Sequence, residues 1–585
     1  MKIKSVHGLV AAGVIASLSL TDCATTGARR PRGAGARARV GGTQFPSRAE
    51  LARLSATPAP RAPATPTAPL ERWELAGPFP EAVGSVPSQD PAPLAALLRA
   101  RAERTGGRAV VTEAMQCAAR ELGRYLLRHE GATPQPISDF VLGRCGALGS
   151  RVSSVTSDGT EAATSSDADV VHHFETALGG QVDQLLDLAP GPINVGAALV
   201  RDGDRFVTYT VSEQRVVALE PGPLTPDANG DVTLAGRLLT TTAGLGGYIN
   251  QGTWSSATCT MDPAVRLPAF RARCPMRPGD TVARVELSAH APGRLLGHSV
   301  LSAIVGSGRA ASRTFELAPD DPAQAARDPQ QAQGVALALL NDARRAAGAP
   351  AVTLAAQESS DACQLAPAYF ANATDNATAG DNDRIALGLI AGWSVEGGLI
   401  RAGHFFGTAG TVDSSLQRWI SWTLERPMGR QVLMAPEVRQ VSLCPAMIDG
   451  RVAGILWSSY SFYDDAELNA EAERVYRRID AQRAATRLPP AQRMASLQPT
   501  MAATAASVVR GGDLEESLQA MLNRASEATG GGAVRGWVIP TIDIDTIEFP
   551  EVLVTTASAS AAVHVVHRRD QGAAWGQSVV FVLMR

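Results

Sequence analysis

Lysine is almost absent from this sequence, because Lys2 and Lys4 are the only two lysines in 585 residues. The body of the chain therefore cannot supply the lysine of a P-loop, a Schiff base or a protein-kinase strand. An excess of charge of either sign is also missing, since 54 basic and 57 acidic residues give a net charge of -3. With a pI near 6.3, the composition gives no reason to expect a nucleic acid as partner.

Long hydrophobic runs are missing as well. No stretch of 18 apolar residues occurs, so the mature chain offers no membrane-spanning helix. The segment Leu9–Leu20 is apolar but too short to cross a bilayer, and it follows the basic residues Lys2 and Lys4. These are the proportions of a signal peptide, so we expect residues 1–22 to direct export.

The next residues, Thr21-Asp22-Cys23, resemble the end of a bacterial lipoprotein signal, in which the cysteine is acylated. Asp22 stands where a small residue is usual. We expect lipidation at Cys23, and the alternative is ordinary cleavage after Ala28 at a small-residue site. Because Ala24 is not acidic, the expected location is the outer membrane of a Gram-negative bacterium, or otherwise its periplasm or exterior, with membrane contact through the lipid anchor only.

Residues 23–90 are predicted to form a tether. The segment Arg29–Arg39 is basic and rich in glycine, and Ala56–Leu70 is dominated by proline, alanine and threonine. Such a composition buries too little apolar surface to form a core and is typical of an extended spacer. Apolar content and regular patterning resume near Pro91.

Six cysteines remain when Cys23 is set aside as the lipid acceptor, and an exported chain can oxidise them. Six cysteines allow fifteen pairings, and the sequence alone does not choose among them. Their grouping along the chain favours one pairing, which places each disulfide inside one domain. That pairing is Cys117 with Cys145, Cys259 with Cys274, and Cys363 with Cys444. No C-x-x-C or C-x-H spacing occurs, so we do not expect a metal site.

Three segments of the chain resemble one another, namely Leu94–Arg128, Val335–Asn372 and Ala470–Val509. In each, an arginine-bearing amphipathic helix is followed by a turn and a second amphipathic helix. Alternating apolar segments, which predict strands, follow each helix pair. They are Ile193–Val200 with Arg205–Val211, Val438–Cys444 with Val452–Tyr460, and Val552–Val566 with Ser578–Leu583. Helices first and an antiparallel sheet later indicate the α+β fold class.

The region 222–318 has a different pattern, with strand-like runs at Asp231–Leu239 and Thr281–Ser288 and no helical periodicity. We interpret it as a small β-sandwich inserted between α+β domains. The expected domains are 1–22 (signal peptide), 23–90 (tether), 91–218 (α+β), 222–318 (β-sandwich), 331–462 (α+β) and 468–585 (α+β).

The domain 331–462 resembles the CAP superfamily, which comprises cysteine-rich secretory, antigen 5 and pathogenesis-related 1 proteins and is also called SCP-like. Leu340–Pro350 stands for the family's L-L-N-x-x-R-x-x-x-G helix and the turn that follows it. Trp422–Leu433 stands for the W-x-x-S-P-x-H-R-x-x-L-L stretch, and Val438–Cys444 occupies the place of the next strand. The resemblance implies an α-β-α sandwich, and the domains 91–218 and 468–585 are similar to more diverged copies.

The resemblance also implies a polar cleft with two histidines and two acidic residues, and here the chain departs from the family. Gly429 replaces the histidine of S-P-x-H-R, and no counterpart of the earlier histidine follows Tyr369. Glu396 and His404 are the remaining candidates for ligand-cleft residues. Two loosely spaced groups do not make a metal site, so we expect no metal and no other cofactor.

These observations favour an exported, non-enzymatic surface protein that binds a ligand, a cell-wall component or a partner protein of the envelope. Binding is what the resemblance implies, since family members are mostly described as binders. The alternatives are a secreted hydrolase with a non-standard site around Glu396 and His404, and a purely structural envelope protein.

Overall fold

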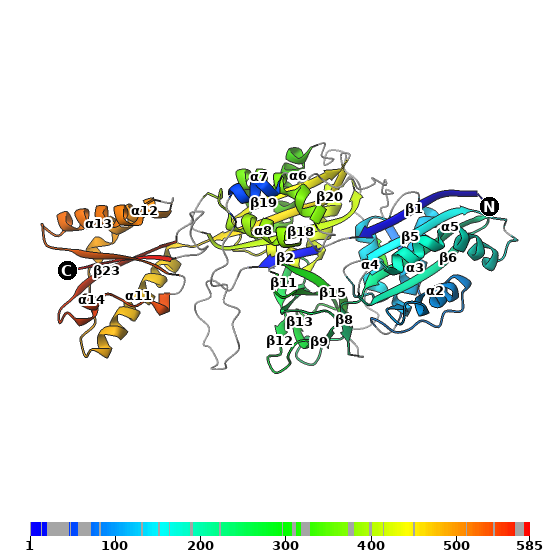
Figure 1. The fold of residues 1–585 in the computed structure, drawn as a ribbon, viewed down its shortest axis with the longest axis horizontal. Coiled ribbons are helices and arrows are strands. Elements are labelled where there is room, and N and C mark those ends of the chain that lie inside the picture. The colour runs from blue at the N-terminus through cyan, green and yellow to red at the C-terminus, as the bar shows by residue number, and fades with distance from the viewer. Residues whose placement is uncertain are drawn as a thin grey trace. The chain divides into compact units, whose positions relative to one another are not determined.

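The computed structural model describes a mixed α+β protein (Figure 1). The described residues are 2–12, 15–19, 46, 48–55, 72–80, 83–129, 133–149, 152–162, 164–187, 191–220, 224–294, 296–306, 312–316, 328–372, 379–396, 400–413, 415–448, 451–509, 512–541, 544–567 and 578–585. Within these ranges, no helix has both the length and the apolar character that crossing a membrane requires.

The chain divides into two compact units. The first unit comprises Met1–Ser19, Ser55–Ala386 and His404–Ser459. The second comprises Leu20–Leu54, Leu387–Gly403 and Tyr460–Arg585.

Repeat 1, residues 93–214, surrounds a sheet with helices on both faces. Its helices are α2 (Pro93–Glu103), α3 (Glu113–Arg128), α4 (Gln135–Cys145) and α5 (Asp167–Asp187). Its strands are β4 (Ala109–Val111), β5 (Val152–Thr160), β6 (Ile193–Asp202) and β7 (Arg205–Gln214). Buried apolar side chains place α3 and α4 on one face and α2 and α5 on the other. The predicted hairpin at 193–211 is therefore confirmed as β6 and β7.

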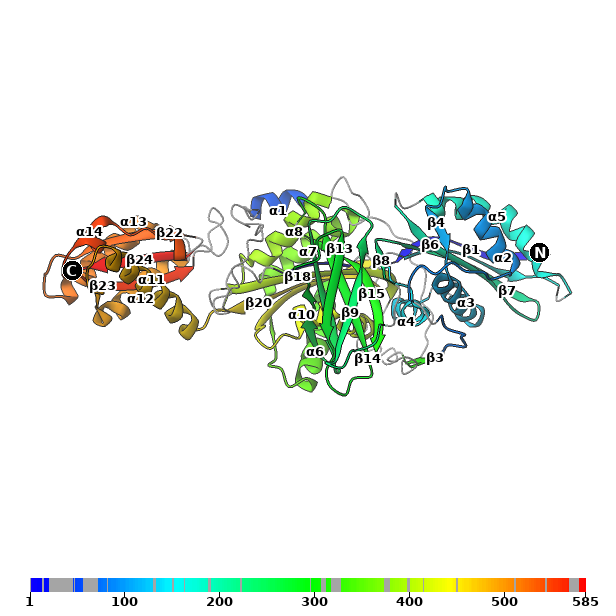
Figure 2. The same cartoon turned by 90° about the horizontal axis from the view of Figure 1, so that it is seen from below.

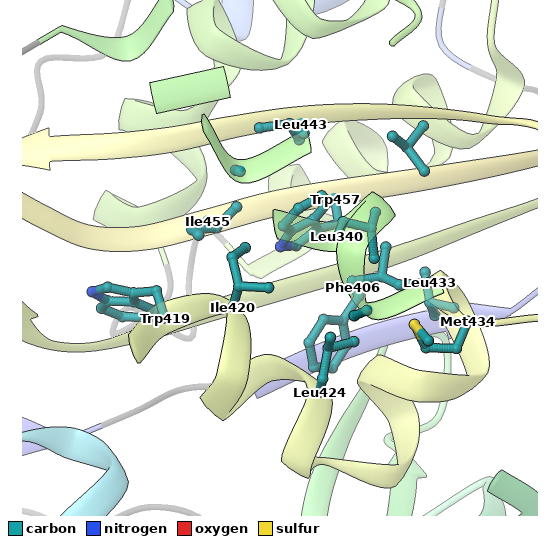
Figure 3. Packing of buried hydrophobic residues seen from close by; sticks show 14 of the residues in the cluster. Leu340, Phe406, Trp419, Ile420, Leu424, Leu433, Met434, Leu443, Ile455 and Trp457 are labelled. Carbon is teal, nitrogen blue, oxygen red and sulfur yellow. The ribbon is translucent and has the colours of Figure 1, made fainter. Parts of the chain in front are cut away.

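Repeat 2, residues 329–462, has the same kind of layering (Figure 3). Its helices are α6 (Pro329–Ala346), α7 (Ala356–Asn372), α8 (Ala379–Ala391), α9 (Leu416–Glu425) and α10 (Pro427–Leu433). Its strands are β17 (Thr353–Leu354), β18 (Ile400–Asp413), β19 (Gln440–Ile448) and β20 (Arg451–Phe462). Phe406 of β18 packs in one core with α6, α9 and α10. The neighbouring Phe405 contacts Tyr369 of α7 instead, with ring centroids 5.4 Å apart, because successive strand residues face opposite sides.

Repeat 3, residues 465–584, is the third copy. Its helices are α11 (Asp465–Ala485), α12 (Gln498–Val509), α13 (Leu514–Ala528) and α14 (Glu551–Thr555), with the 3-10 turns η3 (Ala495–Leu497) and η4 (Ile544–Thr546). Its strands are β21 (Gln492–Arg493), β22 (Arg535–Thr541), β23 (Ser560–His567) and β24 (Ser578–Met584). The prediction that a strand starts at Val552 is wrong, because Pro550 precedes a helical turn whose Leu553 is buried in the core.

The three repeats share one strand order. The orders are β5-β7-β6-β4 in repeat 1, β18-β20-β19-β17 in repeat 2 and β22-β24-β23-β21 in repeat 3. In each, the short first strand runs parallel to the strand beside it, while the later hairpin strands of repeats 1 and 3 are antiparallel. A mixed sheet with the same order three times indicates that one supersecondary unit has been repeated.

A buried arginine marks the same position in repeats 2 and 3. Arg344 on α6 donates from Nε to the Pro350 carbonyl at 2.7 Å, and Arg483 on α11 donates to the Pro489 carbonyl at 2.8 Å. Each also donates to a leucine carbonyl much later in the chain, and each is fully buried. Three residues earlier, Asn341 and Asp480 each accept a backbone N–H from the first residues after the proline turn. The shared hydrogen bonds extend the repeat from topology to individual side chains.

Repeat 1 departs from this arrangement. Arg101 occupies the corresponding place in the sequence. The place is found by counting back from the residue whose backbone N–H bonds the short first strand to the parallel strand beside it. Arg101 is also buried, but its guanidinium contacts Glu175 at 3.1 Å and Asp183 at 2.6 Å on α5. It also donates to the Gly179 carbonyl at 3.0 Å. The arginine therefore ties two helices together here through carboxylates as well as a carbonyl, whereas Arg344 and Arg483 bind backbone carbonyls.

Among the described residues of 217–306, strands are the only regular elements, and we call this part the strand-only segment. They are β8 (Val217–Leu219), β9 (Asp231–Leu238), β10 (Gly244–Gln251), β11 (Ser255–Thr258), β12 (Thr260–Met261), β13 (Ala269–Pro275), β14 (Val282–His290) and β15 (Gly297–Gly306). The sheet β12-β13-β9-β8 and the run β11-β10-β14-β15 share one apolar core. Figure 2 shows β8, β9 and β13 of the first and β14 and β15 of the second. The strands predicted at 231–239 and 281–288 are confirmed.

The N-terminal residues form two strands in the uncleaved chain. β1 (Lys2–Ala12) pairs antiparallel with β5. β2 (Ile15–Ser19) lies between β15 and β18 and joins their sheets into one of nine strands. The signal-peptide prediction concerns processing, which the fold of the uncleaved chain leaves untested.

Ordered structure begins earlier than the predicted end of the tether. Helix α1 (Arg48–Leu54) falls within residues 23–90, and β3 (Arg72–Glu74) pairs with β16 (Thr314–Glu316). Trp73 and Leu75 are buried in the core of repeat 1, and the Glu121 carboxylate accepts the backbone N–H of Ala76 and Gly77. Two buried apolar side chains, a strand pairing and the Glu121 hydrogen bonds thus hold a segment that composition alone assigned to a spacer.

The three disulfides join the cysteines in the pairing that their grouping favoured, so that prediction is confirmed. Cys117 of α3 bonds Cys145 of α4, and Cys363 of α7 bonds Cys444 of β19. Cys259 bonds Cys274 of β13 inside the strand-only segment. Three disulfides are consistent with an oxidising compartment outside the cytoplasm.

Candidate functional site

The segment that resembles the family's W-x-x-S-P-x-H-R stretch forms a helix–corner–helix in repeat 2. Ser415 starts α9 by accepting the Arg418 N–H at 3.3 Å. Arg426 interrupts the helices with an extended backbone, and Pro427 starts α10, where a missing N–H costs nothing. At this corner the Arg426 side chain contacts carboxylates from other parts of the first unit.

Arg426 holds two carboxylates that are far away in sequence. Its Nε donates to Glu286 of β14 at 3.0 Å, with a second contact to the same oxygen, and its terminal nitrogen donates to Asp139 of α4 at 2.9 Å. Trp422 donates its indole N–H to Asp139 at 2.7 Å. The Arg426 side chain is 4% exposed and that of Glu286 is 0% exposed. This charge cluster therefore ties repeat 1, the strand-only segment and repeat 2 together within the first unit.

Neighbouring groups respond to the same buried surroundings. Burial alone would lower the pKa of Arg426, but Glu286 and Asp139 raise it above its usual value. Burial raises the pKa of Glu425 to about 7, and Asp139 adds to the rise while Arg284, Arg430 and Arg426 oppose it. Burial lowers the pKa of Arg430 to about 10. Arg426 therefore stays charged, while the raised pKa of Glu425 means that its carboxyl titrates near neutral pH.

The raised pKa of Glu425 predicts a pH-dependent effect of Glu425→Gln. The folded chain holds this proton more tightly than the unfolded chain, so ionisation destabilises the fold as pH rises from about 4.5 to about 7. Because Glu425 is partly exposed, we expect Glu425→Gln to stabilise the chain by ~1–3 kcal/mol at pH 8 and by almost nothing at pH 4. Urea unfolding at both pH values measures this, with the exposed Glu437→Gln as control. Equal effects at both pH values would contradict the assignment.

The sequence resemblance assigns Gly429 to the position of the family's cleft histidine, and the backbone leaves no room for a side chain there. A Cβ added at Gly429 would lie 2.1 Å from the Thr423 carbonyl oxygen of α9. Real Cβ atoms do not approach backbone oxygens so closely, because this is well inside van der Waals contact. The tight approach of α10 to α9 thus excludes a histidine from this position.

Arg430, the next residue, also packs against backbone. It donates to the carbonyl of Leu424 within α9 and to the carbonyls of Gly252 and Ser255 at 2.9 and 3.1 Å. Asn250 of β10 donates to the Glu425 carbonyl at 2.8 Å in return. The polar side chains of this segment therefore bind backbone of the strand-only segment.

The two predicted cleft residues fall in different compact units. Glu396 lies exposed after α8, in the second unit, and His404 is 6% exposed on β18, in the first unit. Their role in a common cleft stays a prediction. Cys23 lies outside the described residues, so its lipidation also stays a prediction. Across the described ranges, no three side chains of His, Cys, Asp or Glu come together to hold a metal ion.

Sequence reasoning missed Asp139 and Glu286 as partners of Arg426. Glu286 is a charged residue within the apolar strand run that was predicted, and this was its one visible signal. The arginine that pairs with Glu286 lies 140 residues away in sequence, and Asp139 lies 287 residues from Arg426. Local sequence patterns do not reach across such separations.

Comparison with known proteins adds no relative, since the chain matches no protein-family model and no curated protein sequence.

Proposed function

We propose that the chain is an exported, non-enzymatic binding protein of the bacterial envelope. It carries three CAP-like domains, two of them more diverged, and a small β-sandwich between the first and second. The observation that carries this proposal is the combination of a threefold repeated fold with a family cleft segment that is closed and occupied by internal contacts.

The layering of the repeats supports the CAP-like assignment. In repeat 3, α11 and α14 cover one face of the sheet and α12 and α13 cover the other, which is an α-β-α arrangement. Repeat 1 has the same arrangement with α2 and α5 opposite α3 and α4. Arg344, the arginine of the motif L-L-N-x-x-R, has a structural counterpart in Arg483 of repeat 3.

The state of the cleft segment supports binding over catalysis. A general acid or base needs a titratable group within reach of a substrate proton. At the site of the family histidine, Gly429 contacts backbone and Arg426 binds two carboxylates. Gly429 and Arg426 are held in such contacts, so neither offers a proton-exchanging group to a substrate.

Intact mass spectrometry of the protein purified from membranes, with and without reductant and alkylation, tests the export and anchoring. We expect a chain that begins at acylated Cys23 and has six blocked cysteines, three disulfides having formed. An unmodified chain beginning near Arg29 would remove the anchor. Free thiols that alkylate readily would contradict the exported, oxidised state.

Activity and binding assays on the same preparation test whether the protein binds envelope components without catalysis. We expect saturable binding to isolated envelope fractions and no turnover of ester, peptide or glycoside substrates. Turnover that disappears in both Glu396→Gln and His404→Ala would replace the proposal by the hydrolase alternative. Absence of any saturable binding would favour a purely structural role.

A further inference from the structure

Strand β22 is an edge strand with an apolar centre. Among the described residues its only strand neighbour is β24, which pairs with it along Arg535–Thr541. Gly536, Trp537, Val538 and Ile539 are all partly exposed and carry no charge. An edge of this kind presents unpaired backbone donors and acceptors next to apolar side chains, which is the condition for adding another strand.

The opposite edge of the same sheet lacks these properties. β21 is only two residues long, and both Gln492 and Arg493 are exposed. Short strands and charged side chains are the usual means by which proteins prevent pairing at an edge. The contrast marks β22 as the edge that remains open.

In the other two repeats, the strand that corresponds to β22 already pairs with an additional strand. In repeat 1, β5 pairs antiparallel with β1, and in repeat 2, β18 pairs antiparallel with β2. The added strands are apolar for most of their length, with sequences KIKSVHGLVAA and IASLS. The same edge of the same repeated sheet thus accepts an antiparallel apolar strand twice within this chain.

We propose that β22 binds an extended, mainly apolar segment of a partner protein by antiparallel strand addition. This inference rests on the proposed binding function and specifies the chemistry of the partner for repeat 3. The backbone of Gly536–Ile539 supplies the hydrogen bonds, while Trp537 and Ile539 present one face and Val538 the other. Pro540 has no N–H to offer, so it limits the pairing to the centre of β22.

A fluorescent peptide with the sequence of Lys2–Ala12 is the probe, because this strand occupies the matching edge of repeat 1. The target is the uncleaved chain beginning at Met1, because β1 and β2 fill the matching edges of repeats 1 and 2 only before residues 1–22 are removed. We expect saturable binding by fluorescence anisotropy, and we expect hydrogen exchange at alternate amides of Gly536–Ile539 to slow at least tenfold. Protection that appears elsewhere, or nowhere, would overturn the proposal.

Two peptide variants separate strand pairing from general apolar adhesion. Each carries N-methyl groups on alternate residues, and the two sets are complementary. Only one set of N–H groups faces β22, so one variant is expected to bind at least tenfold more weakly and the other within about twofold of the parent. Equal losses, or no loss in either, would contradict backbone pairing.

Val538→Lys is the matching change in the protein, with Gln492→Lys on the polar edge as its control. We expect a tenfold or larger loss of peptide binding for the first and none for the second. Unchanged amide protection in β23 and β24 shows that the variant is folded. If Val538→Lys fails to fold, the N-methylated peptides decide alone.

Two further outcomes are distinguishable. If light scattering shows a dimer of the full chain that dissociates when the peptide is added, a second copy of this chain occupies β22. That result would overturn the proposal of a partner protein. Envelope binding without peptide binding would reject this inference and leave the proposed function standing. Loss of both would reject both.

Discussion

Replacing Arg426 by methionine is expected to lower the free energy of unfolding of the first unit by about 3–5 kcal/mol. The change leaves Glu286, whose side chain is 0% exposed, without its cation and removes the contact to Asp139. A carboxylate stranded in a buried site costs more than the loss of packing, which methionine largely preserves. Urea unfolding followed by tryptophan fluorescence measures the effect, because Trp422 donates to Asp139 in the same cluster.

Two comparison variants show whether the effect comes from the buried pair. Arg345→Met removes an exposed arginine of the same repeat, with 78% of its side chain exposed, and should cost less than about 0.5 kcal/mol. The double variant Arg426→Met with Glu286→Gln removes both buried charges and should recover much of the loss. A double variant no more stable than Arg426→Met alone would contradict the stranded-charge explanation.

The Arg426 cluster shows how a sequence that resembles a cleft motif can take on a packing role. Met428 adds a backbone N–H to the same Glu286 carboxylate at 3.4 Å, so the start of α10 is also fixed by this group. Glu425, next in sequence, lies among charges of both signs. The segment therefore joins three parts of the first unit.

Local patterns predicted the repeated helices and most strands correctly. The run Asp231–Leu239 marks β9, in which buried side chains alternate with more exposed ones. The run Arg205–Val211 marks β7, although that strand is buried on both faces. The grouping of cysteines gave the disulfide pairing, since each bond closes within one repeat or segment.

Long-range contacts were beyond these patterns. Trp73 was assigned to a tether, yet it lies against Tyr125 of α3 with ring centroids 5.4 Å apart. The closed position at Gly429 depends on how tightly two helices meet at a corner, which no spacing rule encodes. Local propensity determines where an element forms, whereas the partner of a buried charge depends on the whole packed arrangement.

Arg344→Lys and Arg483→Lys are expected to have similar, large effects, because the two arginines make the same contacts in different repeats. Each guanidinium reaches a proline carbonyl through Nε and later carbonyls through its terminal nitrogens, including those of Leu433 and Leu553. A lysine ammonium is a point donor and cannot span these carbonyls. At least two buried acceptors would lose their donor, which corresponds to about 2–4 kcal/mol of local stability.

Hydrogen exchange measures this loss repeat by repeat, which global unfolding of a multidomain chain does not. For Arg344→Lys we expect faster exchange in α6, α10 and β19, and for Arg483→Lys in α11, α14 and β23, because these elements flank the bonded carbonyls. Arg345→Lys and Arg477→Lys, at exposed positions of the same two helices, are the controls. If only one of the buried arginines proves important, the two sites share geometry without sharing a structural role. Matched losses in the two repeats would instead show that the arginine is part of the repeated unit, because two unrelated domains have no reason to rely on the same guanidinium in the same way.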